Sequence, residues 1–432
     1  MMFKFTRNVG GCLGITRSGA KRVRAVAGTI RWFSSGTVLQ KNKYNSVLLS
    51  SDRLRHLEFD KHYKIRSNIE LLIQDYAKKP IPPLTFQYLT DYQPPLSKNE
   101  EYMLTIKTIN LLLSYTCRRL NAIQQLPYVA VVNPSIEKSY SLYLKTLESL
   151  LSIEFPYALH NRDAIHGLLI EFLDDHQDTV ETLSRGLEEI MDYIPRELIF
   201  DFLDHHLRDR IAMKILVTHH LSLANYDPEK HKNTIGTIHK DFPIADIVKR
   251  VSEFVSDLCF VKYDHVVAPV KIVSGADVTF PCIPTILEYV LTEILKNSYR
   301  AHIENSTESR NLIDKPVEIN IVKNQNYDEE LEIRIRDFGG GIPPKVEEHI
   351  FEYSYTTVVA NKKETGSSAY VIPGEDINIV SGMGFGLPLC KAYVEMFDGT
   401  LEIQSLWGWG TDVYIKLKGP SKKMLESQVK DN

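Results

Sequence analysis

The sequence predicts a two-domain α+β protein, in which an N-terminal helical bundle precedes a mixed domain of strands and helices. Apolar residues recur every three or four positions in the first half, whereas short runs in the second half alternate apolar and polar residues. The chain has 432 residues, which is enough for two or three domains. Its 43% of apolar and 25% of charged residues exclude a disordered chain, and no apolar run is long enough to span a membrane.

The N-terminal segment is basic and contains no carboxylate before Asp52. Nine lysines and arginines precede that residue, with large apolar side chains such as Phe3 and Trp32 among them. This composition is typical of a mitochondrial transit peptide, so we expect residues 1–33 to be cleaved off after Phe33; a basic tail that binds nucleic acid or membrane is the alternative. Cleavage removes seven positive charges and lowers the net charge from −4 to −11, which disfavours nucleic-acid binding.

Long segments with helical periodicity predict the bundle, which we place at residues 51–226. A first helix is expected within 51–78, before a Pro-rich break. Four longer segments with almost no interior glycine then cover 100–126, 137–154, 162–191 and 196–225.

A polar linker, Ala224–Asn233, leads into the mixed domain, which we place at residues 240–418. The patterns predict helices over 244–261, 284–305 and 387–397, and strands over 270–273, 317–323, 331–337, 401–406 and 412–417. Strands segregated in this way favour a sandwich in which the helices cover one face of the sheet.

The helix predicted over 284–305 carries the first candidate motif, Glu293-Ile-Leu-Lys-Asn297. Glu293 and Asn297 are four residues apart and therefore lie on one face of the helix. A carboxylate can accept a proton, and a carboxamide oxygen can bind a hard cation such as Mg²⁺. Taken alone, the pair is better explained as a solvated helix face.

Asp337-Phe-Gly-Gly-Gly-Ile-Pro343 follows a predicted strand. Its glycines allow a sharp turn close to a ligand, and a carboxylate at a strand end can accept a hydrogen bond from an amine such as adenine N6. In isolation a Gly-rich hairpin turn is an equal alternative. The DFG motif of ordinary protein kinases is excluded, because no HRD loop or VAIK strand accompanies it.

Gly382-Met-Gly-Phe-Gly-Leu-Pro388 opens the helix predicted over 387–397. Glycines before a helix N-terminus leave backbone N–H groups available to an anion, and the helix dipole adds to the attraction. We therefore expect a phosphate site without the lysine of a Walker motif. Gly408-Trp-Gly-Thr-Asp412 then enters the last strand, where Thr411 can offer a hydroxyl to a nucleotide.

The order of these motifs resembles the Bergerat ATP-binding fold of gyrase, MutL, the heat-shock ATPase chaperones and histidine kinases, with residues 344–381 as an ATP lid. Within that superfamily, Glu293-Ile-Leu-Lys-Asn-Ser-Tyr-Arg-Ala301 is similar to the E-L-x-K-N-A-x-R-A box of the mitochondrial 2-oxo acid dehydrogenase kinases. These are the pyruvate dehydrogenase kinases and the branched-chain 2-oxo acid dehydrogenase kinase. The segments His176–Leu187, Asp209–Leu221 and Tyr353–Thr357 also resemble this family.

This resemblance implies a protein-serine kinase that uses Mg-ATP, with K⁺ as a further possible cofactor. It implies that Glu293 is the general base for a substrate serine, that Asn297 holds Mg²⁺, and that Asp337 contacts adenine. The other nucleotide-binding residues that it implies are Arg300, Gly339, Gly341, Thr356, Thr357, Gly382, Met383, Gly384, Phe385, Gly386, Leu387 and Thr411.

The resemblance also implies partners: the E1α subunit as substrate, the lipoyl domain of E2 and a second copy in a homodimer, all in the mitochondrial matrix. We favour pyruvate dehydrogenase as the substrate, because that complex is the more widespread in mitochondria. Tyr289 favours the branched-chain complex, because many pyruvate dehydrogenase kinases have His at that position, and so does the short tail of 14 residues after Lys418. The sequence leaves the roles of His176 and His220 open, since packed histidines usually have local partners.

Three other functions fit the sequence less well. An autophosphorylating histidine kinase needs an HExxxP box, and His239-Lys-Asp-Phe-Pro243 has the wrong spacing. A chaperone-like or mismatch-repair ATPase needs a long middle domain after the ATPase. An inactive kinase that only binds E2 would not need an intact set of Glu293, Asn297 and Asp337.

Overall fold

The computed structural model describes residues 64, 67–153, 161–263, 270–306, 315–324, 329–353 and 384–426. The predicted transit peptide and most of the predicted ATP lid lie outside these residues. The chain forms two compact units, residues 1–81 with 105–175, and residues 82–104 with 176–432. Compactness alone does not mark an independently folding domain, so the predicted domain boundaries stay a prediction. No helix in the described part is long and apolar enough to cross a membrane.

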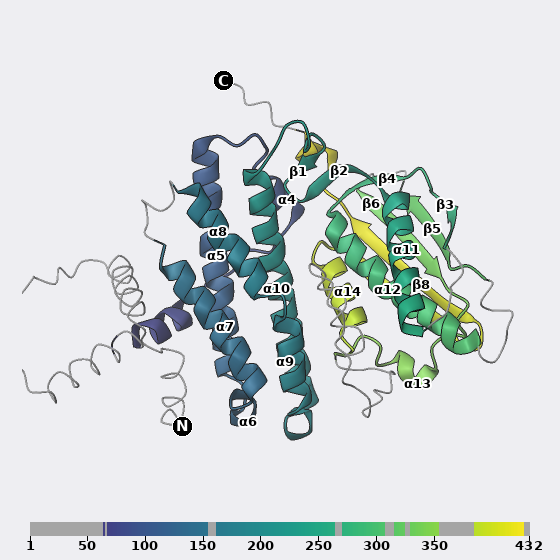
Figure 1. Cartoon of the computed structure of the whole chain (residues 1–432), viewed down its shortest axis with the longest axis horizontal. Helices are drawn as coiled ribbons and strands as arrows, with labels where there is room; N and C mark the ends of the chain where they lie inside the picture. Colours follow the sequence, from purple (N-terminus) through teal and green to yellow (C-terminus); the bar gives the residue numbers. More distant parts are fainter. Residues whose placement is uncertain are drawn as a thin grey trace, which may run out of the picture. The chain divides into compact units, whose positions relative to one another are not determined.

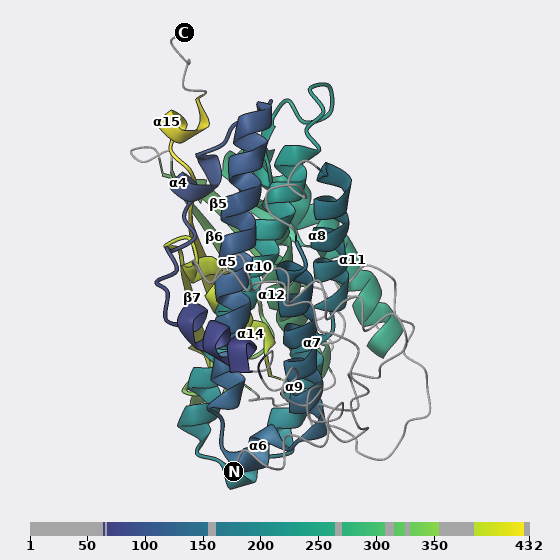
Figure 2. The same ribbon diagram turned by 90° about the vertical axis from the view of Figure 1, so that its left-hand side faces the viewer.

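The first unit is helical. It contains a helix over 67–77, α5 (Lys98–Gln124) from Thr105 onward, α6 (Tyr128–Val131), α7 (Pro134–Leu151) and α8 (Arg162–Asp175). Asn133 starts α7, because its side chain accepts hydrogen bonds from the backbone N–H groups of Ser135 and Ile136, at 2.9 and 3.3 Å. Helices α7 and α8 contact each other along the bundle in Figure 2.

The second unit begins with α4 (Phe86–Thr90) and continues after the first unit with α9 (Thr179–Glu188), a 3₁₀ turn (Met191–Tyr193) and α10 (Arg196–Ala224). The prediction of one helix over 162–191 is therefore wrong. The backbone turns at 176–178, where Arg210 of α10 donates hydrogen bonds to the carbonyls of His176 and Gln177, both at 3.0 Å. Carbonyls that bind a side chain in this way no longer need helical partners, so the helix ends there.

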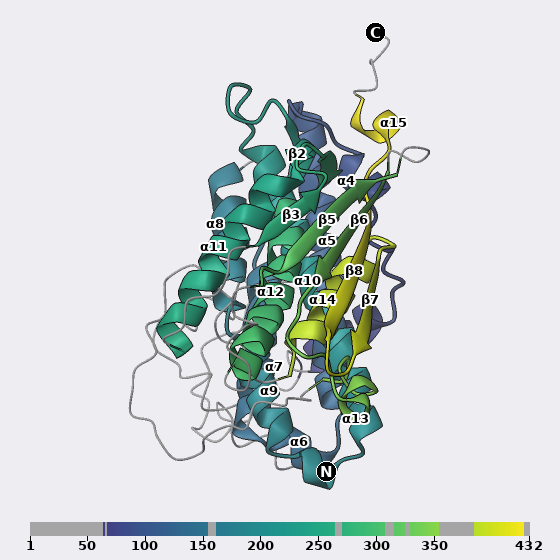
Figure 3. The same cartoon turned by 90° about the vertical axis from the view of Figure 1, so that its right-hand side faces the viewer.

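A five-stranded mixed sheet dominates the second unit, and Figure 3 shows its strands side by side. Their order across the sheet is β3 (Lys271–Ser274), β5 (Glu318–Lys323), β6 (Glu330–Arg336), β8 (Gly410–Lys418) and β7 (Thr400–Leu406). Only β3 and β5 pair in parallel, because α12 (Pro284–Ser306) lies between them in the sequence and supplies the long connection that parallel strands need. The other pairs are antiparallel: short connections join β5 to β6 and β7 to β8, whereas β6 and β8 pair although α13 (Pro344–Glu347), α14 (Gly386–Glu395) and β7 lie between them in the sequence.

A second, three-stranded antiparallel sheet was not predicted. It consists of β1 (Thr234–Ile235), β2 (Ile238–Pro243) and β4 (Thr279–Cys282). β1 and β4 have only two and four residues, and the burial of β2 does not alternate. Pro243 and Pro281 also interrupt the usual strand composition. Two further short helices, α13 (Pro344–Glu347) and α15 (Lys422–Leu425), lie in connections and at the C-terminal end.

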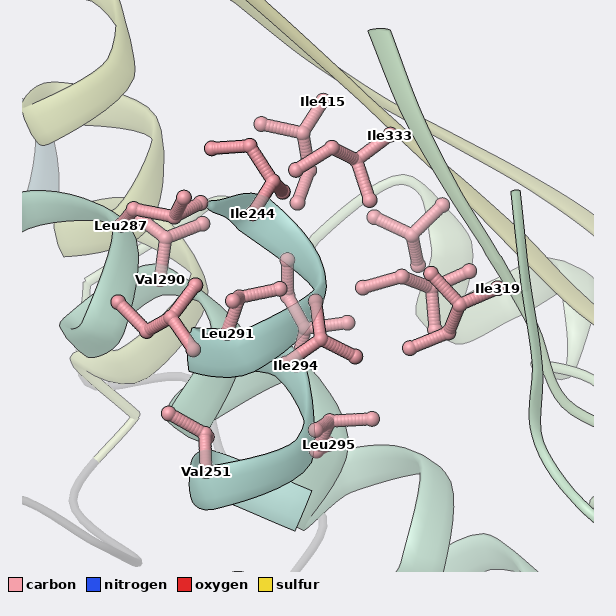
Figure 4. Packing of buried hydrophobic residues seen from close by; sticks show 14 of the residues in the cluster. Ile244, Val251, Leu287, Val290, Leu291, Ile294, Leu295, Ile319, Ile333 and Ile415 are labelled. Atoms are coloured by element: carbon pink, nitrogen blue, oxygen red, sulfur yellow. The ribbon is translucent and has the colours of Figure 1, made fainter. Parts of the chain in front are cut away.

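The core of the second unit lies between the large sheet and the helices α11 (Ile244–Tyr263), α12 and α14 (Gly386–Glu395), as Figure 1 shows. Every second residue of β6 is buried, so one face of the sheet meets the helices. Figure 4 shows side chains of α11 and α12 pointing toward Ile319, Ile333 and Ile415 of the strands. This core fixes the position of α12, which carries the candidate base, and the predicted α+β fold is confirmed.

Candidate functional site

Glu293 lies in the middle of α12 and only 4% of it is exposed. Its Oε1 accepts a hydrogen bond from Nζ of Lys296, 2.6 Å away, and Lys296 is buried as well. Burying a carboxylate is costly unless an opposite charge and a hydrogen-bond donor accompany it, and Lys296 supplies both. Lys296 therefore holds Oε1 of the predicted base, and this hydrogen bond does not include the second oxygen, Oε2.

The second oxygen of Glu293 faces the first turn of α14. A Cβ atom added at Gly386 would lie 2.6 Å from Oε2, so only glycine leaves room for the carboxylate. Phe385 precedes the helix and its side chain makes no capping hydrogen bond to the first N–H groups of α14. The predicted base therefore lies beside a helix N-terminus, which favours anions such as phosphate.

Asn297 lies one turn after Glu293 and is exposed, whereas its neighbours Lys296 and Ser298 are buried. The described residues contain no cluster of three His, Cys, Asp or Glu that could hold a metal ion. A single exposed carboxamide fits Mg²⁺, which usually takes few protein ligands and completes its shell with phosphate oxygens and water.

Arg300, which the resemblance assigns to the nucleotide, is engaged elsewhere in this structure. Its Nε donates a hydrogen bond to Oε1 of Glu304, 2.6 Å away and one turn further along α12. A nucleotide contact by Arg300 would therefore compete with this ion pair, and that part of the prediction stays untested.

Asp337 follows β6 directly and is 5% exposed. Its Oδ1 accepts hydrogen bonds from the N–H groups of Gly339 and Thr411, at 2.9 and 3.3 Å, and Oδ2 accepts one from Ser298 Oγ at 3.4 Å. Burial raises the pKa of Asp337 to about 6, although these hydrogen bonds oppose the shift. At neutral pH the side chain is thus mainly an ionised, buried acceptor, which suits the amine of adenine.

The turn after Asp337 packs closely against α12 and the end of β7, which requires its glycines. A Cβ atom at Gly339 would lie 2.4 Å from the Cβ of Ala301 on α12, and one at Gly341, where φ is +74°, would lie 2.5 Å from Leu406 O. The strand β8 approaches equally closely, because a Cβ atom at Gly410 would lie 2.1 Å from Asp337 O. The close packing of the turn after Asp337, α12 and β8 therefore brings Asp337 and Thr411 together, as the motifs suggest.

The entry into α14 is described from Gly384 onward. Gly384 has a φ of +76°, and Phe385 is fully buried, with its ring 5.8 Å from that of Tyr353. The predicted site residues that the structure brings into one region are Glu293, Asn297, Asp337, Gly339, Gly341, Gly384, Phe385, Gly386, Leu387 and Thr411. Thr356, Thr357, Gly382 and Met383 lie outside the described residues.

Three residues at this site were not predicted. Lys296 had a weak signal, since it lies three residues after Glu293 on the same helix. Ser298 and His302 gave none. His302 Nε2 accepts a hydrogen bond from the N–H of Phe338 at 2.9 Å, and burial lowers the pKa of this histidine to about 4, which keeps it neutral. His176 and His220, whose roles the sequence leaves open, are both buried.

Two protein families match this chain. Residues 83–239 match a family described as mitochondrial branched-chain alpha-ketoacid dehydrogenase kinase. Residues 282–421 match the family of histidine kinase-, DNA gyrase B- and HSP90-like ATPases. The second match contains every predicted site residue, which confirms the resemblance of the motifs to that ATPase fold.

Individual relatives match most of the chain. It is 55% identical over 381 residues to [pyruvate dehydrogenase (acetyl-transferring)] kinase 1, mitochondrial, of Saccharomyces cerevisiae, covering 88% of this chain and 94% of the relative. It is 29% identical to [pyruvate dehydrogenase (acetyl-transferring)] kinase, mitochondrial, of Arabidopsis thaliana, covering 69% of this chain and 80% of the relative. Isozyme 3 of Homo sapiens is also 29% identical, with 82% and 87% covered.

Proposed function

Because this chain belongs to the mitochondrial pyruvate dehydrogenase kinase family, an ATP-dependent group of protein kinases, we propose that it phosphorylates a serine of the E1α subunit of pyruvate dehydrogenase and so inactivates that complex. The observation that carries this proposal is the position of Glu293. Its carboxylate is buried, held by Lys296 and placed against the N-terminus of α14. A carboxylate in that position can take the proton of a serine hydroxyl beside a bound phosphate.

The nucleotide is held by the groups around this carboxylate. Asp337 accepts a hydrogen bond from the adenine amine, Thr411 adds its hydroxyl, and the N–H groups at the start of α14 bind phosphate oxygens. Asn297 holds Mg²⁺, which neutralises charge on the phosphates when it is bound. Thr356, Thr357, Gly382 and Met383 complete the nucleotide site by resemblance to the family, and K⁺ stays a prediction of that resemblance.

The partners follow from the family. The relatives are named mitochondrial, and the acid-free N-terminus supports import of this chain into the matrix. We place the E2 lipoyl domain on the helical region and a second copy of the chain on the large sheet. Exposed Leu406, Trp407 and Trp409 at the hairpin between β7 and β8 support a protein contact at this end of the sheet.

A branched-chain 2-oxo acid dehydrogenase is the second candidate substrate. The match of residues 83–239 to the branched-chain kinase family favours it, as does Tyr289 before the base. The 55% identity to a pyruvate dehydrogenase kinase covers more of the chain and therefore decides our choice.

The test is to incubate the protein with Mg²⁺ and γ-labelled ATP, adding purified pyruvate E1 and branched-chain E1 in separate reactions. We expect acid-stable phosphoserine on the α subunit of pyruvate E1. Faster labelling of branched-chain E1 would instead establish the second candidate. Acid-labile phosphate on the protein itself, with neither E1 labelled, would contradict both and indicate a histidine kinase.

A further inference from the structure

The contact between α10 and α14 contains charged groups to which the proposed function assigns no role. The two helices lie against each other within the second unit, as Figure 1 shows. Buried side chains of α14, such as Leu389, Ala392 and Val394, are apolar, whereas its contact with α10 includes an ion pair. The cost of removing charges from water offsets most of their attraction, so such a pair adds little net stability. It is better suited to fixing how the two helices are placed.

Arg208 of α10 holds the C-terminal end of α14. Its Nη2 donates a hydrogen bond to Oε2 of Glu395, 2.6 Å away. Its Nε donates one to Oδ2 of Asp204, 2.9 Å away and one turn earlier on α10. The side chains of Arg208 and Glu395 are 35% and 33% exposed, so both are partly buried. Because the planar guanidinium is bound on two sides, its direction is fixed, and so is the place of Glu395.

Tyr353 links α10 to the other end of α14. Its hydroxyl donates a hydrogen bond to Oδ1 of Asp204 at 3.0 Å. Its ring lies 5.8 Å from that of Phe385, the residue directly before α14, and both rings are buried. Burial and the Asp204 carboxylate raise the pKa of Tyr353 above its usual range, so the hydroxyl keeps its proton and stays a donor.

The two oxygens of Asp204 therefore lead to opposite ends of α14. Oδ1 leads through Tyr353 to the start of the helix, and Oδ2 leads through Arg208 to its end. A helix of ten residues moves as one piece, so contacts at both ends set the position of its first turn. That turn carries the N–H groups proposed to bind phosphate, and such donors must lie within about 0.5 Å of their productive positions.

We propose that Asp204 and Arg208 are positioning residues for the phosphate site at the start of α14. They lie on a different element from every residue proposed to touch the nucleotide, and they act through Tyr353 and Glu395. Partly exposed ion pairs contribute little to the stability of a fold, so the loss of this one should displace α14 without unfolding the protein. This role rests on the proposed binding of ATP phosphates by α14.

The first test measures the equilibrium binding of Mg-ATP and of adenosine, without E1, to Arg208→Glu and to Tyr353→Phe. Arg208→Glu places a third carboxylate beside Asp204 and Glu395. Their repulsion should weaken ATP binding about tenfold to a hundredfold, the range of one hydrogen bond to a charged group. Tyr353→Phe removes only the hydroxyl and should weaken ATP binding about threefold to tenfold. Adenosine should bind both variants as it binds the wild-type protein, because the adenine contacts lie on the large sheet.

Arg250→Glu is the matched control. Arg250 on α11 forms an ion pair with Glu288 on α12, at 3.3 Å, so this pair also joins two helices of the second unit but does not include α14. The control should leave the binding of both ligands unchanged. All these variants should unfold at nearly the wild-type temperature, because partly exposed pairs contribute little to stability.

The decisive measurement adds Glu395→Arg to Arg208→Glu. The double variant exchanges the charges of the pair and should recover most of the lost ATP affinity, although Glu395→Arg alone should weaken ATP binding. Wild-type ATP affinity of Arg208→Glu, an equal loss of adenosine binding, or no recovery in the double variant would overturn the proposal. A wild-type protein that binds ATP no better than adenosine would instead refute the phosphate site itself, so the two failures are distinguishable.

Discussion

The buried carboxylate of Asp337 suits the binding of an amine but lowers the free energy of unfolding at neutral pH. Its pKa is about 6 in the folded chain against an ordinary value of 3.8, because burial disfavours the charged form. Between these two pH values the folded protein binds a proton that the unfolded chain does not. The free energy of unfolding therefore receives its full contribution from this group below about pH 4 and loses it as the pH rises through about 6.

Asp337→Asn should make the nucleotide-free protein more stable at pH 7, since Asn resembles the protonated acid. A shift of about two pH units corresponds to a gain of at most about 3 kcal/mol in the free energy of unfolding. The same variant should bind ATP tenfold to a hundredfold more weakly, because it offers the adenine amine no carboxylate. This corresponds to a loss of about 1–3 kcal/mol in the free energy of ATP binding. Denaturant unfolding and calorimetry measure the two effects. Wild-type ATP affinity would mean that the turn after β6 is only a turn.

His219 ties several elements of the second unit together. Its Nε2–H donates a hydrogen bond to the carbonyl of Leu89 at the end of α4, and Nδ1 accepts one from the N–H of Thr237 between β1 and β2. Burial lowers the pKa of His219 to about 4, so the folded chain holds it neutral where the unfolded chain would protonate it. This contribution to stability is complete above about pH 6.5 and is lost as the pH falls toward 4.

His219→Gln should make the free energy of unfolding less dependent on pH between about 6.5 and 4. Gln can donate a hydrogen bond to Leu89 and accept one from Thr237, but it does not titrate. The wild-type protein should lose about 3 kcal/mol of unfolding free energy across this window through His219, and the variant should not. Chemical denaturation at a series of pH values provides the comparison. Parallel curves for the two proteins would show that the pKa of His219 is not depressed in the fold.

The start of α14 is the element on which the site depends most. Gly386→Ala should displace the Glu293 carboxylate, because the added methyl group would lie 2.6 Å from Oε2. We expect kcat to fall at least tenfold while the protein stays folded, as judged by its thermal transition. Gly167→Ala on α8 is the control: an added Cβ meets nothing within 4 Å, so alanine should be neutral or slightly stabilising. Equal activity of both variants would place the carboxylate elsewhere.

The sequence predicted the long elements of the fold, since they leave strong local patterns, whereas the nucleotide contacts of the site residues stay a prediction. The strands β5, β6 and β8 and the helices α10, α11 and α12 lie within a few residues of their predicted bounds. The break between α8 and α9 was missed because it depends on Arg210, which lies more than 30 residues further along the chain. His302 was missed for the same reason, because its partner Phe338 is 36 residues away. Lys296 lies close to its partner Glu293 in the sequence, but the burial that makes this ion pair important arises only in the fold.

At the scale of the whole molecule, import is the main open prediction. Deleting residues 1–33, which lie outside the described part, should leave the protein in the cytosol with its kinase activity intact, because the deletion removes seven positive charges and no predicted site residue. Fractionation of cells that express the two forms, followed by a kinase assay of each fraction, tests this. A truncated protein that still reaches the mitochondrial matrix would contradict the transit-peptide interpretation.

The central claim is that Glu293 removes the proton of a serine hydroxyl, and Glu293→Gln tests it most directly. The variant keeps the size and shape of the side chain, and Asn297 and Asp337 remain, so Mg-ATP should bind with nearly wild-type affinity in a calorimetric titration. Transfer of phosphate to E1 should fall by about 10²–10⁴, the usual share of general-base catalysis. Transfer at the wild-type rate by a Glu293→Gln protein would contradict the account.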